Sequence, residues 1–194
     1  MNNRHCLGFF LPFALAACGA ETQRAQSGGG LPEVDAGAHD GGPTTQYAFP
    51  SWERQDMQPQ SPRANETYGL ETFRGHTLVV VLLEGYCPYC QSNAKVAEQL
   101  QSALTAEKRD VEIVVLTDFA ADQFVGKIGL RIFHDNLAGR PAWQSMRAGA
   151  AKHDTFVFGP NGLRTYFWEG SYTGDAPWWT EEVGAAMRAV APVR

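Results

Sequence analysis

Two cysteines separated by two residues are the part of this sequence best suited to chemistry. They stand in Gly85-Tyr86-Cys87-Pro88-Tyr89-Cys90, where an apolar run ends and a helical pattern begins. A thiol pair at this spacing can cycle between a dithiol and a disulfide, with one sulfur attacking a substrate and the other resolving the mixed disulfide. The pair therefore predicts thiol redox chemistry that needs no cofactor beyond a Cys87–Cys90 disulfide.

The flanking segments predict how this pair is positioned. Leu78 to Leu83 is a continuous run of Leu and Val, which predicts a strand buried on both faces. From residue 91 onward, apolar residues recur every three to four positions, the period of a helix face. Cys87 then lies at the helix start, where unpaired N–H groups and the helix dipole favour a thiolate. We expect Cys87 to attack and Cys90, one turn later, to resolve.

The residues around the pair fit this placement. Pro88 suits the first helical position, because its ring presets φ and its missing N–H would have had no partner there. Tyr86 and Tyr89 are expected to flank the site and shape access to it.

The number of cysteines limits what the pair can do. The chain has four, and Cys6 and Cys18 fall within a predicted export signal, which leaves only the pair in the folded part. A zinc site of three or four thiolates is therefore excluded. A structural disulfide is the other interpretation, but so small a loop removes little entropy from the unfolded chain.

Residues 1–17 predict a signal peptide. Arg4 and His5 precede an apolar stretch that is too short to span a bilayer as a folded helix. It ends in Leu15-Ala16-Ala17-Cys18, which resembles the bacterial lipoprotein cleavage box, and the resemblance implies that Cys18 becomes the lipidated first residue. Gly19 follows instead of Asp, which in that family implies the outer membrane, facing the periplasm or the cell surface. An ordinary secretory signal is the alternative.

Composition and charge divide the remaining chain. Residues 18–46 are rich in Gly with almost no large apolar residue, which predicts a flexible tether. Residues 47–194 are long enough for one domain. The formal charge of −5 and the lack of a basic patch exclude a nucleic-acid partner.

The order of predicted elements indicates the fold. A second buried strand at 111–116 makes a strand–helix–strand unit with the first, and weaker patterns suggest a helix at 120–127 and a strand at 130–133. A helix at 138–148, a hairpin of 155–158 with 163–168, and a helix at 177–190 follow. This order, with the cysteine pair at the first strand–helix junction, resembles the thioredoxin fold, an α/β fold with a central mixed sheet flanked by helices.

The resemblance extends to a narrower family. Pro50-Ser51-Trp52 before the first strand, Trp143, and Lys152 and Asp154 before the hairpin are similar to the amino-terminal domain of selenoprotein P. That family has selenocysteine at the first redox position, where this chain has Cys87. The resemblance implies that Cys87 attacks and Cys90 resolves, while peroxide reactivity is weakened, because a thiolate is a poorer nucleophile and leaving group.

His153 occupies the position at which thioredoxins have a cis-proline facing the cysteines. A cis bond without proline costs about 2.5–4 kcal/mol, so we expect a trans peptide. Three interpretations of His153 stay open: an acid/base or thiolate partner of Cys87, a metal ligand with both cysteines, or a solvent-facing loop residue. Two thiolates and an imidazole suit Cu(I) or Zn²⁺, and Sco-type copper-delivery lipoproteins have a similar set, although with three residues between their cysteines.

Together these features predict an exported, lipid-anchored thiol–disulfide oxidoreductase in the cell envelope. Its expected partners are a protein disulfide or peroxide substrate, a membrane or periplasmic electron donor or acceptor, and the lipid that anchors it. A soft-metal delivery protein that uses Cys87, Cys90 and His153 is the alternative.

Overall fold

The cysteine pair follows the central strand of a five-stranded sheet. The computed structural model describes residues 47–136, 138–170 and 176–194, so the predicted signal peptide, Cys18 and the tether lie outside the described residues. The strand order is β5-β4-β3-β6-β7, and β3 spans Thr77–Leu83. Every residue of β3 is buried, as the apolar run predicted.

The sheet is mixed, as predicted. Strand β3 pairs in parallel with β4, β4 pairs in parallel with β5, and β6 and β7 add antiparallel pairs on the other side. These strands are β4 (Val111–Thr117), β5 (Arg131–His134), β6 (Thr155–Phe158) and β7 (Arg164–Trp168). Helix α1 (Pro88–Ala106) joins β3 to β4, which confirms the predicted strand–helix–strand unit and places Cys87 at its turn.

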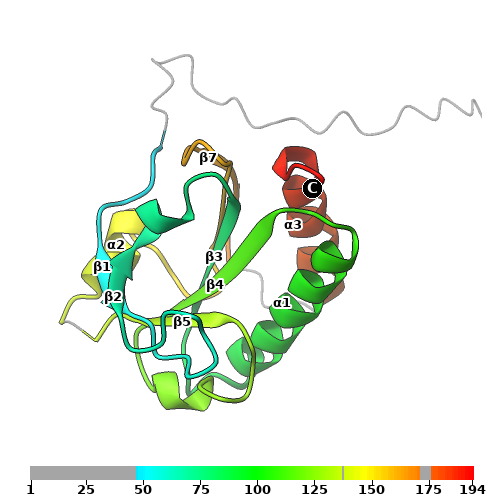
Figure 1. The fold of residues 1–194 in the computed structure, drawn as a ribbon. Coiled ribbons are helices and arrows are strands. Elements are labelled where there is room, and N and C mark those ends of the chain that lie inside the picture. Colours follow the sequence, from blue (N-terminus) through cyan, green and yellow to red (C-terminus); the bar gives the residue numbers. More distant parts are fainter. Residues whose placement is uncertain (1–46, 137, 171–175) are drawn as a thin grey trace, which may run out of the picture. The chain divides into compact units, whose positions relative to one another are not determined.

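Alternate residues of β3 pack into two separate cores. Val79, Val81 and Leu83 share one core with residues of α1 and α3 (Ala176–Val190), whose Val183 and Met187 are fully buried. Leu78, Val80 and Leu82 face the opposite core, which includes α2 (Pro141–Met146). Figure 1 shows α1 and α3 together on one side of the sheet, and α2, β1 and β2 on the other. The sheet is therefore covered on both faces, and the helix that carries the cysteines is fixed against it.

The segment before β3 is more regular than the sequence indicated. Strands β1 (Glu53–Gln55) and β2 (Thr67–Gly69) form a small antiparallel sheet, followed by the 3-10 turn η1 (Leu70–Phe73). Trp52 is buried and meets Phe133 edge-on, with ring centroids 5.5 Å apart. The two strands are short and largely polar, so they lack the alternating apolar pattern that predicts a strand.

Two predicted helices are shorter than expected. At 120–127 only the 3-10 turn η2 (Ala121–Gln123) forms, because Ala120 has a φ of +49° and Gly126 one of +70°. At 138–148 the helix begins only at Pro141, since Gly139 and Arg140 are also left-handed, with φ of +80° and +52°. Among the described residues, no helix combines the length and apolarity that crossing a membrane requires.

Candidate active site

Cys87 is the N-cap residue of α1. Its backbone is extended, with φ −87° and ψ +114°, and its Sγ accepts a hydrogen bond from the Cys90 N–H at 3.4 Å. Pro88 occupies the first helical turn, as the sequence predicted. The sulfur thus replaces the oxygen of an ordinary N-cap and lies against the positive end of the helix dipole. Cys87 Sγ therefore caps the first turn of α1.

The two sulfurs lie in different environments. Cys87 is half-buried and reachable from solvent, whereas Cys90 is fully buried, and both are free thiols. Burial raises the pKa of the Cys90 thiol, and its hydrogen bond to Cys87 raises it further. The exposed sulfur is therefore the one that an incoming substrate meets, and the buried sulfur stays protonated beside it.

His153 lies directly against both cysteines. It is 2% exposed, so the interpretation as a solvent-facing loop residue is wrong. Its Nε2 is 3.5 Å from Cys90 Sγ and 3.9 Å from Cys87 Sγ. Burial lowers the pKa of His153, and the charge of Lys152 lowers it further, so the neutral ring is favoured. The partner and ligand interpretations both stay open.

The backbone at His153 is held from both sides. Its N–H donates to the Leu82 carbonyl at 2.7 Å, and its carbonyl accepts from Thr155 Oγ1 at 3.1 Å. No peptide bond in the described ranges is cis, which agrees with the expected trans peptide. However, His153 has a φ of +71°, a left-handed conformation that costs a residue with a Cβ free energy. Strained residues of this kind cluster at functional sites.

Asn93 is a site residue that the sequence analysis missed. It lies on α1 three residues after Cys90, and its Nδ2 is 2.8 Å from His153 Nδ1. Nothing in the sequence distinguishes it from a polar residue on a solvated helix face. Only the position of His153, sixty residues later in the chain, reveals its role.

Three exposed aromatic residues lie on the segments next to Cys87. Tyr86 is 79% exposed, Tyr89 is 65% exposed and Phe119 is 59% exposed. Phe119 comes close because the Gly85 N–H donates to its carbonyl at 3.1 Å. A Cβ on Gly85 would lie 2.1 Å from the Ala120 carbonyl oxygen, so this close approach requires glycine. We call Tyr86, Tyr89 and Phe119 the aromatic rim.

Charged groups form a chain beside the site. Lys152 Nζ lies 3.5 Å from Glu84 Oε2, and Arg140 lies 3.9 Å from Glu84 and 3.2 Å from Asp118. Burial raises the pKa of Asp118, and the negative charge of Glu84 adds to the effect. The negative charges of Glu84 and Cys87 raise the pKa of Lys152. A cation therefore stays near Cys87 across the physiological range.

The two sulfurs and His153 together offer three donor atoms for a metal. Their three ligand atoms lie within 4.8 Å of one another. Two thiolates and an imidazole are soft and intermediate donors, which suit Cu(I) or Zn²⁺ better than Mg²⁺ or Ca²⁺. The donor chemistry therefore fits a soft metal.

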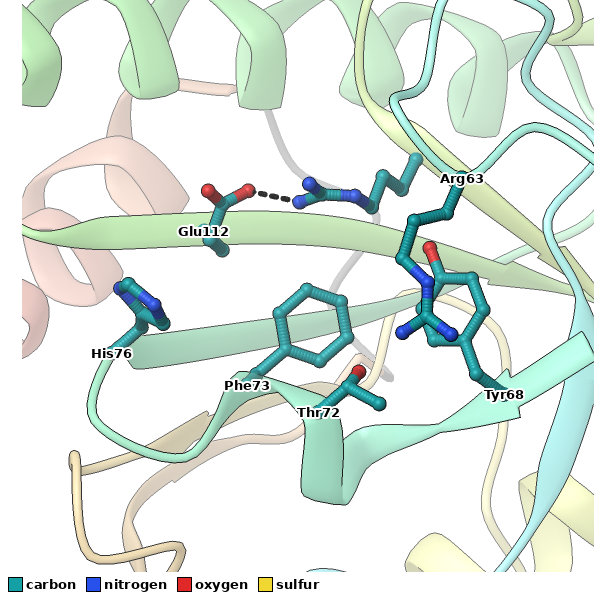
Figure 2. A pocket seen from close by; sticks show the side chains of 7 residues that line it. Arg63, Tyr68, Thr72, Phe73, His76 and Glu112 are labelled. Atoms are coloured by element: carbon teal, nitrogen blue, oxygen red, sulfur yellow. Dashed lines mark hydrogen bonds and ion pairs between the residues drawn. The ribbon is translucent and has the colours of Figure 1, made fainter. Parts of the chain in front are cut away.

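A separate pocket lies away from the cysteines. Figure 2 shows it lined by Arg63, Tyr68, Thr72, Phe73, His76 and Glu112, together with Arg131. Its charged groups are already paired: Arg131 with Glu112, Arg63 with Glu66, and His76 with Asp110. None of its lining residues belongs to the cysteine site, so it gives no indication of function.

Comparison with known proteins gives the fold. No protein-family model and no curated protein matches the chain. Among solved structures, a secreted Mycobacterium tuberculosis disulfide oxidoreductase homologous to E. coli DsbE has a TM-score of 0.55 and 15% identity, covering 71% of this chain and 95% of that one. A thiol:disulfide interchange protein of the thioredoxin family from Chlorobium tepidum gives 0.56 and 12%, covering 77% and 99%.

A third similar structure carries a different family name. It is a SCO1/SenC family lipoprotein from Bacillus anthracis, with a TM-score of 0.55 and 14% identity, covering 75% of this chain and 96% of that one. At these identities the likeness establishes the architecture and not the activity. With its mixed five-stranded sheet, its flanking helices and its cysteine pair at the first strand–helix turn, this chain has a thioredoxin-like fold.

Proposed function

We propose that this protein is a thiol–disulfide oxidoreductase of the bacterial cell envelope, with Cys87 as the attacking and Cys90 as the resolving residue. One observation carries the proposal: an accessible sulfur at a helix N-cap lies beside a buried one, and His153 Nε2 is within 3.9 Å of both. Neighbours named as disulfide oxidoreductases and interchange proteins support the general class.

The first step is attack on a substrate disulfide. The Cys87 thiolate forms a bond to one substrate sulfur, the substrate S–S bond breaks, and the departing sulfur leaves as a thiolate that takes up a proton. The product is a mixed disulfide between Cys87 and the substrate. The reacting sulfur lies at the N-cap of α1, where it accepts the Cys90 N–H.

The second step frees the substrate. The Cys90 thiol loses its proton, the resulting thiolate attacks Cys87 Sγ, and the second substrate sulfur leaves and is protonated. The Cys87–Cys90 disulfide forms, so the enzyme dithiol is oxidised while the substrate disulfide is reduced. His153 Nε2 lies 3.5 Å from Cys90 Sγ, within reach of the thiolate that forms there. An external dithiol donor then restores the reduced pair.

The aromatic rim supports a polypeptide as the disulfide substrate. Large exposed aromatic side chains on the segments next to a reactive cysteine offer a contact surface, and a protein segment has matching apolar area. A peroxide is the second substrate class: it would oxidise Cys87 to a sulfenic acid with release of an alcohol or water, and Cys90 would then condense with it and release water.

Reduction of insulin by dithiothreitol tests the proposal. The full chain should accelerate the reaction, and Cys87→Ser should remove the acceleration. Ser92→Ala is the matched control, because Ser92 is an exposed residue on the same helix turn. Unchanged turnover in Cys87→Ser would reject the mechanism.

Soft-metal binding and delivery is the second candidate function. It is favoured by the compact set of Cys87, Cys90 and His153 donors and by the similarity to a SCO1/SenC lipoprotein. In this function the three side chains would hold one Cu(I) ion as cargo. Anaerobic titration should then give one Cu(I) per chain, and His153→Ala should lose it. Uptake that is weak and independent of His153 would argue against delivery.

We further propose that the protein is anchored through a lipid on Cys18, in the outer membrane. The support is the resemblance of Leu15-Ala16-Ala17-Cys18 to the lipoprotein box, followed by Gly19. Metabolic labelling with a clickable fatty acid should mark the wild type and not Cys18→Ala. Label that survives this substitution would exclude the anchor.

A further inference from the structure

The two ring nitrogens of His153 have separate partners. Nε2 faces the two sulfurs, and Nδ1 lies 2.8 Å from the side-chain amide of Asn93. Among the described residues, His153 Nδ1 is the only hydrogen-bonding partner of that amide. Asparagine also favours a helix interior less than alanine does. The helix itself therefore gives no reason for Asn93, whereas the contact with His153 does.

The chemistry of the amide determines which ring nitrogen carries the proton. The amide nitrogen is only a donor, so Nδ1 must accept with its lone pair. A neutral imidazole has one ring proton, which then resides on Nε2. This proton points toward Cys90 Sγ at 3.5 Å and Cys87 Sγ at 3.9 Å. In this state the ring donates to whichever sulfur becomes a thiolate.

We propose that Asn93 is a positioning residue that fixes His153 as an Nε2–H donor toward both sulfurs. The inference rests on the proposed disulfide chemistry, in which each step starts from an enzyme thiolate within reach of this N–H. A carboxylate in place of the amide can only accept, so it would draw the ring proton to Nδ1. The Nε2 lone pair would then face the sulfurs, as a proton acceptor or as a metal ligand.

Nuclear magnetic resonance of the ¹⁵N-labelled full chain tests the proposal. Couplings between the ring protons and both ring nitrogens identify the protonated nitrogen, and the His153 signals are those absent from His153→Gln. In the wild type and in the control Ser92→Ala, His153 should carry its ring proton on Nε2. In Asn93→Asp, which is nearly isosteric, the ring proton of His153 should be on Nδ1. In Asn93→Leu, His153 should be a mixture of the two tautomers.

The proposal is overturned if the wild type is Nδ1–H, or if Asn93→Asp keeps the wild-type tautomer. The measurement needs no turnover. A wrong tautomer can therefore be told apart from a negative insulin assay, which tests whether Cys87 reacts at all.

Discussion

Replacing His153 by glycine and by alanine separates the strain in its backbone from the role of its ring. The two variants differ by one methyl group, and both lack the imidazole. At a φ of +71°, a Cβ approaches the following carbonyl and costs about 1–2 kcal/mol. At an ordinary φ the order is opposite, because glycine loses about 0.5–1 kcal/mol more than alanine through conformational entropy.

The strain of a Cβ at this φ exceeds the entropy cost of glycine, so glycine is favoured at position 153. We expect His153→Gly to exceed His153→Ala in free energy of unfolding by about 0.5–1 kcal/mol. For a domain of this size, that corresponds to a melting temperature higher by roughly 1–4 °C. Urea denaturation followed by circular dichroism measures the difference. Both variants should lose insulin reduction equally, since neither places a nitrogen beside the sulfurs.

An independent left-handed position calibrates the measurement. Lys108 has a φ of +57° and lies exposed after α1, so Lys108→Gly should likewise exceed Lys108→Ala in stability. If the Lys108 pair shows the expected order and His153→Ala equals or exceeds His153→Gly, the argument from strain is refuted. If His153→Gly keeps full activity, the ring has no part in the chemistry.

Three further predictions concern the surroundings of the site. Because burial lowers the pKa of His153, the folded chain binds fewer protons than the unfolded chain below about pH 6.5, so the free energy of unfolding should fall as the pH drops through this value. His153→Gln should reduce this fall in urea titrations, and an identical fall would disprove the assignment. Gly85→Ala should cost about 1–3 kcal/mol, because its methyl would meet the Ala120 carbonyl. Gly129→Ala, which meets only the tip of Glu98, is its control, and equal losses would contradict the close approach. Asn93→Asp should raise the affinity for Zn²⁺ by about tenfold in calorimetry, since a carboxylate behind a histidine strengthens it as a ligand; unchanged affinity would count against this.

The part of the fold that holds Cys87 follows from local patterns. The apolar run before it and the helical period after it predict β3 and α1, and Pro88 marks the helix start. The hairpin of β6 and β7 is equally evident, because Asn161 and Gly162 mark its turn, and α3 is evident because its apolar residues recur at helical spacing.

The rest of the site depends on contacts between distant segments. His153 precedes β6 in a polar loop, and its burial arises only because β6 pairs with β3 and brings it to Leu82. Asn93 and Phe119 have no local signal at all, since each acquires its role from a residue more than thirty positions away. Sequence patterns report local preferences, and such juxtapositions follow from sheet pairing.

Trapping of the mixed disulfide tests the central claim most directly. The Cys90→Ser chain is mixed with a peptide disulfide, digested, and examined by mass spectrometry. A substrate cysteine should be found attached to Cys87, whereas Cys87→Ser should trap little, because Cys90 is buried. Equal trapping by both variants, or no adduct on Cys87 in Cys90→Ser, would contradict the assignment of Cys87 as the attacking residue.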